Sequence, residues 1–178
     1  LSVNLDVSKT IKREKFHTLL ALALVTASPV LLRILVLQSV LGRHVNENYL
    51  VSNVAGYILS VDSETLERTE FANSGLSAPK GMVVVDDVVY VTDLTQVEGY
   101  SLVEEPGFSL AVSGSAFLNG ITADLAGNLY AADTDLGKIF KIVIETKAVS
   151  NLATTGLTGV NGVFFDQANN RLIAVPWK

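Results

Sequence analysis

A unit of about 40 residues recurs along this chain of 178 residues and limits the folds that it can adopt. In each copy a glycine begins a short apolar run, a turn follows, and a second apolar run ends at a polar residue. The glycines are 39 and 42 residues apart, and the polar residues are each 40 apart. Such a period indicates that one supersecondary unit is stacked on copies of itself. The repeated positions are Gly81, Gly120 and Gly162, and Asn53, Asp93 and Asp133.

The apolar runs within each copy are short and are separated by turn residues. Ala126-Gly127-Asn128 and Asn169-Asn170 each join two runs, as a β-hairpin requires. A third run, Lys138–Ile142, alternates with the period of a strand, and a fourth follows at Ala148–Leu152. Four strands in about 40 residues predict an all-β fold built from β-propeller blades of four antiparallel strands. A β-sandwich is the alternative, although sandwiches lack this strict period.

The repeat also predicts how the chain is divided. We expect an incomplete β-propeller at residues 30–178, with blades at about 38–75, 76–116 and 117–157 and a partial blade at 158–178. About three blades and a part are fewer than the four to eight that close a ring. We therefore expect the leading part of a longer protein or, alternatively, an open arc. The strand edges of an open arc could pair with another chain, so self-association is expected in that case.

Apolar residues are concentrated near the N-terminus, where 17 of the 24 residues from Thr18 to Leu41 are hydrophobic. Four basic residues between positions 9 and 15 precede the apolar core Thr18–Val25 and the small residues Thr26–Ser28. This order predicts a signal-peptide-like segment at residues 1–29 and a secreted or periplasmic protein. An uncleaved membrane anchor and a buried helix are the alternatives. Arg33 argues against one span through the whole segment, because a charge at that depth is costly.

Charge and composition exclude several classes of function. Residues 45–178 carry seven basic and sixteen acidic side chains, a net charge of −9, which would repel a nucleic-acid backbone. The chain has no cysteine, and His17 and His44 are its two histidines, so thiolate sites and a multi-histidine metal site are not expected. Gly114 and Gly120 do not open a helix, so we expect neither a nucleotide nor a flavin.

Five motifs of the repeat resemble the blades of one known group of propellers. They are similar to the senescence-marker-protein, gluconolactonase and luciferin-regenerating-enzyme family, whose blades are in turn similar to NHL repeats. The resemblance covers about Val36 to Trp177 and implies six blades around a channel that holds Ca²⁺ or another divalent cation. It also implies hydrolysis of a small lactone or ester at that cation. The motifs are Ala78–Met82, Val89–Asp93, Phe117–Gly120, Gly127–Tyr130 and Val160–Val163.

The resemblance implies particular site residues. Asn119 and Asn161 match the positions of metal ligands, and Gln38 falls where the family has a glutamate. Lys80 stands at a corresponding channel-facing place, where it could contact an acidic group of a substrate. These positions supply no carboxylate, although calcium prefers carboxylates and a hydrolase needs a general base or an activated water. No catalytic residue is therefore predicted, and membership of the family does not by itself predict activity.

Each candidate also has a purely structural interpretation. Asn119 and Asn161 precede glycines and could be turn residues, and Lys80 could be solvated beside a turn. Asp133 could act as a general base, but the recurrence of Asp93 and Asp133 favours acceptance of backbone N–H bonds in the turn that follows. Three functions thus remain open: a secreted lactonase-like or esterase-like hydrolase, a non-catalytic propeller that binds a ligand or partner, and an inactive fragment.

Overall fold

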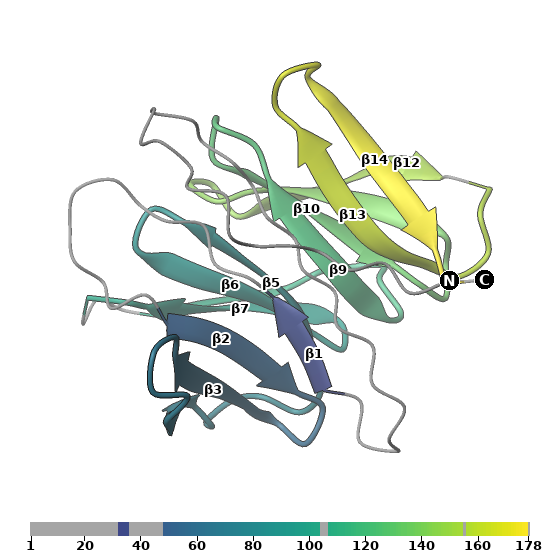
Figure 1. The fold of residues 1–178 in the computed structure, drawn as a ribbon. Coiled ribbons are helices and arrows are strands. Elements are labelled where there is room, and N and C mark those ends of the chain that lie inside the picture. Colours follow the sequence, from purple (N-terminus) through teal and green to yellow (C-terminus); the bar gives the residue numbers. More distant parts are fainter. Residues whose placement is uncertain (1–31, 36–47, 104–106, 155, 178) are drawn as a thin grey trace, which may run out of the picture.

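The chain forms an arc of β-sheets. The computed structural model describes residues 32–35, 48–103, 107–154 and 156–177, and these residues form strands and turns without a helix. Three four-stranded antiparallel sheets and one two-stranded hairpin lie side by side (Figure 1). In each sheet the strands pair in chain order, as in the blades of a propeller. The prediction of an all-β fold with four-stranded antiparallel blades is confirmed.

The four blades follow one another along the chain. The first contains β1 (Leu32–Leu35), β2 (Asn48–Asn53), β3 (Tyr57–Asp62) and β4 (Arg68–Ala72). The second contains β5 (Pro79–Val85), β6 (Val88–Asp93), β7 (Gln96–Ser101) and β8 (Phe108–Ala111). The third contains β9 (Leu118–Ala123), β10 (Asn128–Asp133), β11 (Lys138–Val143) and β12 (Ala148–Thr154). The fourth is the hairpin of β13 (Val160–Asp166) and β14 (Arg171–Pro176).

The first blade begins earlier than the expected boundary near residue 38. Strand β1 pairs with β2 in an antiparallel register that joins Leu32 to Asn53 and Leu35 to Leu50. The signal-like segment at residues 1–29 lies outside the described residues. Among the residues that the structure describes, no helix is long and apolar enough to cross a membrane.

The apolar core lies between the blades. One cluster joins the first and second blades, a second joins the second and third, and a third joins the third blade to the hairpin. Every residue of β10 is buried, because this strand has a blade on each side. The rings of Tyr130 and Phe165 stack across the last junction with centroids 5.5 Å apart. Burial of these apolar side chains is the main force that holds neighbouring blades together.

Glycines set how closely the blades approach. A Cβ atom on Gly81 would overlap the backbone carbonyl oxygen of Asn119, and one on Gly120 would overlap that of Asn161. The inner strands β5, β9 and β13 therefore approach one another backbone to backbone at these positions. A Cβ atom on Gly162 would instead meet a side chain, at 2.7 Å from the Cγ2 atom of Val175.

Candidate functional site

The residues before the three glycines form a row across the inner strands. Lys80, Asn119 and Asn161 each precede one of these glycines near the start of β5, β9 and β13. Because the glycine contacts fix the level of neighbouring strands, the structure brings the three predicted residues to equivalent places. We call this set the pre-glycine row. The fourth predicted residue, Gln38, lies outside the described residues.

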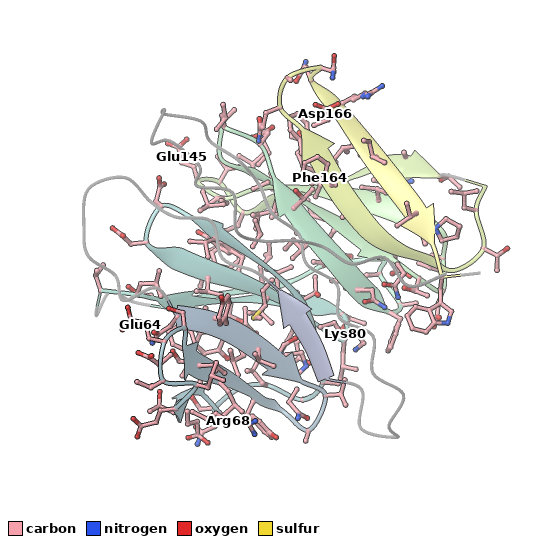
Figure 2. The ribbon with its side chains drawn as sticks, viewed as in Figure 1. Glu64, Arg68, Lys80, Glu145, Phe164 and Asp166 are labelled. Carbon is pink, nitrogen blue, oxygen red and sulfur yellow. The ribbon has the colours of Figure 1, made fainter. Side chains whose placement is uncertain are left out.

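Lys80 is buried rather than solvated, which corrects the structural alternative given for it. Its Nζ atom donates to the carbonyl oxygen of Ala78 at 2.9 Å. The same atom lies 4.1 Å from the centroid of the Phe117 ring, so the charge interacts with an aromatic face of the next blade. Figure 2 labels Lys80, which belongs to β5 of the second blade. Asn119 is also buried, whereas Asn161 is half-buried.

Hydroxyl groups bind the backbone of this row from the neighbouring blade. Ser52 Oγ on β2 donates to the carbonyl oxygen of Lys80 at 2.6 Å. Forty residues later, Thr92 Oγ1 on β6 donates to the carbonyl oxygen of Asn119 and accepts from the Gly81 N–H at 3.0 Å. These two hydroxyl residues were not predicted, although their spacing of 40, directly before Asn53 and Asp93, is a signal that could have found them. At the third junction this position is an alanine.

The recurring acids accept backbone hydrogen bonds, as the structural interpretation predicts. Asp93 is fully buried and accepts from the N–H groups of Ser77 (2.7 Å) and Ala78. These donors lie just before the inner strand of the same blade. The sequence predicts donors in the turn that follows Asp93, and this prediction is wrong. The reason is the pairing of β5 with β6, which places Asp93 opposite Pro79.

Asp133 accepts hydrogen bonds both from residues before the inner strand and from the turn that follows Asp133. Its Oδ2 atom accepts from Ala116 N–H at 2.6 Å and Phe117 N–H at 3.2 Å, before the inner strand. Its Oδ1 atom accepts from Leu136 N–H at 2.9 Å, in the turn that follows. Asn53 accepts from Ala55 N–H at 2.9 Å in its own turn. These polar groups hold the turns in place and are already occupied by backbone donors.

The described residues fit a calcium ion poorly. The pre-glycine row offers two amide side chains beside a lysine ammonium, which repels a cation. Calcium takes six to eight oxygens and is held best where carboxylates supply charge. Within the described ranges no group of three or more His, Cys, Asp or Glu side chains is placed to hold a metal ion. The nearest repeated acids, Asp93 and Asp133, accept backbone hydrogen bonds instead.

Exposed apolar side chains lie at the same end of the arc as the row. Val54, Leu94 and Leu136 lie in the turns between the second and third strands of three successive blades, and are 43%, 41% and 40% exposed. The second strand of each blade ends where the inner strand begins, so these turns and the pre-glycine row share one end. Leu94 has a φ of 54°, a left-handed conformation that is unfavourable for leucine.

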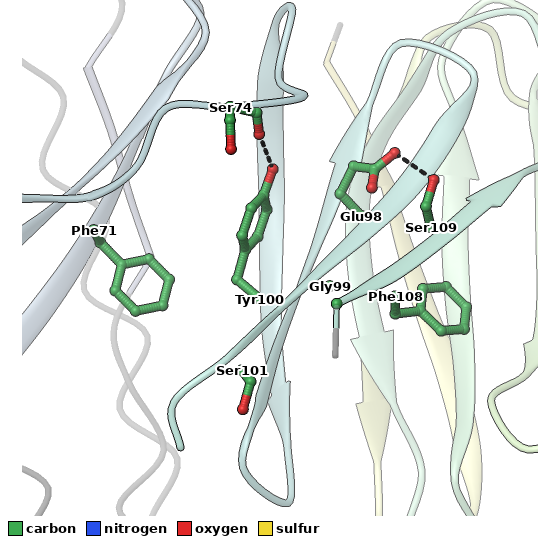
Figure 3. Close-up of a pocket in the computed structure, with 9 residues that line it drawn as sticks. Phe71, Ser74, Glu98, Gly99, Tyr100, Ser101, Phe108 and Ser109 are labelled. Atoms are coloured by element: carbon green, nitrogen blue, oxygen red, sulfur yellow. Dashed lines mark hydrogen bonds between the residues drawn. The ribbon is translucent and has the colours of Figure 1, made fainter. Parts of the chain in front are cut away.

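A groove of about 450 Å³ lies elsewhere, on the outer strands of the first and second blades (Figure 3). Phe71 and Tyr100 meet edge to face there, with centroids 6.4 Å apart. The polar groups of the groove bind one another: Tyr100 donates to the Ser74 carbonyl oxygen at 2.8 Å, and Ser109 donates to Glu98 at 2.9 Å. Burial raises the pKa of Glu98, and the hydrogen bond from Ser109 opposes that rise. The groove is thus separate from the row, and the hydroxyl groups of Tyr100 and Ser109 are engaged.

Comparison with known proteins supports the fold and does not define a family. No family model and no curated protein matches the sequence. The structure is similar to one from a nidogen/laminin complex, with a TM-score of 0.65 and 22% identity over 74% of this chain and 53% of that chain. It is similar to streptogramin B lyase, with a TM-score of 0.58 and 12% identity over 72% of this chain and 51% of that one.

A third similarity is to a computationally designed protein, Ika4. The TM-score is 0.55 and the identity 12%, over 78% of this chain and 95% of that chain. The present chain thus spans about half the length of the nidogen/laminin and lyase chains and nearly all of the designed one. At these identities the similarities establish that the chain has a β-propeller fold and extend no further.

Proposed function

We propose that this chain is a non-catalytic binding propeller that holds a protein partner at the end of the arc bearing Val54, Leu94 and Leu136. The observation that carries the proposal is the exposure of an apolar side chain at the equivalent turn of three successive blades.

The polar groups at this end support binding rather than catalysis. Asp93 and Asp133 are buried acceptors of backbone hydrogen bonds, and Lys80 is buried between Ala78 and Phe117. The pre-glycine row contains no carboxylate that could act as a general base. The net charge of −9 on residues 45–178 favours a partner whose apolar side chains lie within a basic surface. The similar chain from the nidogen/laminin complex belongs to an assembly of two proteins, which supports protein binding as a use of this fold.

A displayed library of random peptides tests the proposal. The full chain is expected to select peptides that combine apolar and basic residues. The triple replacement Val54→Ser, Leu94→Asn and Leu136→Ser removes the apolar anchors. It should weaken binding of the selected peptides on the order of tenfold or more, as measured by calorimetry.

Leu66 provides the matched control. It has a φ of 60° and is 66% exposed, but it lies in the turn between β3 and β4, at the opposite end of the strands. The Leu66→Asn variant should bind the peptides as the wild type does. Peptides whose affinity is unchanged by the triple replacement, or failure to select any peptide, would refute the proposal.

The second candidate is the lactonase-like hydrolase that the family resemblance implies. The observation that favours it is the placement of Asn119 and Asn161 before the contacting glycines of neighbouring inner strands, as two ligands of one ion would require. Calorimetric titration with calcium and assay of δ-lactone hydrolysis test it. If the candidate is correct, the wild type binds calcium and hydrolyses the lactone, and Asn119→Ala and Asn161→Ala each weaken both. Absence of calcium binding and of hydrolysis rejects it.

A further inference from the structure

The groove between the outer strands of the first and second blades contains a carboxylate at a position that is apolar in the other four-stranded blades. The third residue of the third strand is Leu59 in the first blade, Glu98 in the second and Phe140 in the third. Phe140 belongs to the apolar cluster that the third blade shares with the preceding one. Glu98 lies on the same face of β7 as Tyr100, which packs on the cluster between the first two blades. The second blade therefore places a charge where the repeat otherwise places an apolar side chain.

The charge of Glu98 is not neutralised within the described part of the chain. Its Oε1 atom accepts from Ser109 Oγ at 2.9 Å, whereas no donor of the described residues bonds its Oε2 atom and no lysine or arginine among them forms an ion pair with it. Lys147 of the next blade contacts the Ser109 carbonyl oxygen at 3.5 Å and lies 4.9 Å from the centroid of the Phe108 ring. Burial raises the pKa of Glu98, and the charge of Asp93 adds to that rise. The ionised carboxylate thus lacks a compensating positive charge.

Aromatic rings lie beside this carboxylate. Figure 3 shows the ring of Tyr100 between Phe71 and Glu98, and the two rings meet edge to face. The hydrogen bond from Tyr100 to the Ser74 carbonyl oxygen holds one ring in place. Aromatic faces attract cations and also cover apolar groups. The groove volume of about 450 Å³ is that of a site for a small molecule.

We propose that the groove binds a small organic cation, a primary alkylammonium whose apolar body lies on Phe71 and Tyr100 and whose ammonium group donates to Oε2 of Glu98. One carboxylate oxygen suits the point charge of an ammonium, whereas a guanidinium binds best to both oxygens at once. A divalent cation would require several more oxygen ligands. The net charge of −9 on residues 45–178 attracts a cationic ligand.

This site is independent of the proposed protein-binding end of the arc. The residues that line the groove belong to the outer strands and the turns beside them, and Val54, Leu94 and Leu136 are not among them. Failure of either proposal therefore leaves the other to its own test.

Calorimetric titration of the full chain with phenethylammonium tests the proposal. Two further probes separate charge from apolar contact: 2-phenylethanol keeps the ring without the charge, and methylammonium keeps the charge without the ring. Phenethylammonium should bind with a dissociation constant on the order of 1 mM or lower. Each of the other two probes should bind more weakly, on the order of tenfold or more.

Variants identify the groove as the place of binding. Glu98→Gln keeps the shape and the acceptor for Ser109, and should weaken phenethylammonium binding on the order of tenfold or more because the charge is removed. Its thermal stability should equal or exceed that of the wild type, since a half-buried charge without a partner is costly. Phe71→Leu should weaken binding about threefold, because it removes an aromatic face.

Glu70→Gln is the matched control, at an exposed carboxylate of the neighbouring outer strand β4 that does not line the groove. This variant should bind phenethylammonium as the wild type does. The proposal is overturned by a wild type that does not bind phenethylammonium, or by equally tight binding of 2-phenylethanol or methylammonium. Equal effects of Glu98→Gln and Glu70→Gln, or unchanged affinity of Phe71→Leu, also overturn it.

Discussion

The carboxylates of Asp93 and Asp133 show how a buried charge can stabilise this fold. Both are fully buried, and backbone N–H groups surround them where a counter-ion would otherwise be required. A buried carboxylate without partners is costly, whereas a charged acceptor of several N–H bonds is stabilising. The acids therefore fix the turn before the inner strand to the end of the second strand.

Replacing Asp133 by asparagine should destabilise the chain by about 3 kcal/mol, since it removes charge-assisted hydrogen bonds and faces an NH₂ group toward N–H donors. Urea unfolding measures the change. Asp135→Asn, at an exposed residue of the same turn, is the control and should change stability by less than about 0.5 kcal/mol. Equal effects of the two substitutions would contradict the assigned role.

Asp124 and Tyr130 form a second polar contact with a pH dependence. Burial alone would raise the pKa of Asp124, but hydrogen bonds from Asn128, Tyr130 and Ala126 outweigh it and hold the pKa below its ordinary value. Burial, the hydrogen bond to Asp124 and its negative charge raise the pKa of Tyr130 to about 12. Because the folded pKa of Asp124 is depressed, its contribution is present above the unfolded pKa and is lost as the pH falls through the folded pKa.

Tyr130→Phe should lower stability at neutral pH by about 1–3 kcal/mol, since it removes a hydrogen bond to a charged group and keeps the ring that stacks on Phe165. The difference from wild type should shrink in acid, where Asp124 becomes protonated. Carboxyl NMR titration should show the pKa of Asp124 moving up toward its ordinary value. An unchanged titration of Asp124 would show that the phenol does not stabilise the carboxylate.

At the scale of strands, hydroxyl groups and glycines define the junctions between blades. Ser52 and Thr92 each donate to a carbonyl group of the next inner strand, at a place where glycine permits close approach. The third junction has Ala132 at that position, and Thr134 Oγ1 donates to the Val160 carbonyl oxygen at 2.8 Å instead. The junctions thus share one geometry but differ in their polar contacts.

Thr92→Val should cost about 2 kcal/mol, because the shape is kept while the Gly81 N–H and the Asn119 carbonyl lose their buried partner. Thermal or urea unfolding provides the measurement. Thr95→Val, at an exposed threonine of the following turn, should be nearly neutral. A neutral Thr92→Val would show that this hydroxyl does not link the blades.

The strands were predictable because their signals are local. Alternation of apolar residues and the turns at Gly127 and Asn170, which have φ values of 76° and 48°, depend on neighbours in sequence. The environment of Lys80 was not predictable, because it depends on Phe117, a residue of the next blade. The donors to Asp93 were missed for the same reason, since they lie about 16 residues earlier and are brought there by strand pairing.

At the scale of the whole molecule, stability should decline from the middle of the arc to the hairpin. Every residue of β10 is buried, whereas β14 contains no fully buried residue and is paired on one side among the described strands. Strands with few buried contacts open most readily.

Hydrogen exchange should therefore be slowest in β10 and faster in β14 than in the second strands of the other blades. Mass spectrometry of exchanged peptides measures this gradient. Uniform protection across the blades would contradict the expected gradient.

The junction between blades has a consequence for how such a chain can change in length. The second and third units each carry a hydroxyl or small residue on the second strand for the unit that follows, and a carbonyl before a glycine on the inner strand, next to the unit that precedes. When such a unit is duplicated in a gene, the copy therefore carries the groups for both of its junctions. A duplicated unit would at once place its hydroxyl and its carbonyl against matching groups of its neighbours. An insertion of part of a unit would instead separate the hydroxyl from the carbonyl that accepts its hydrogen bond.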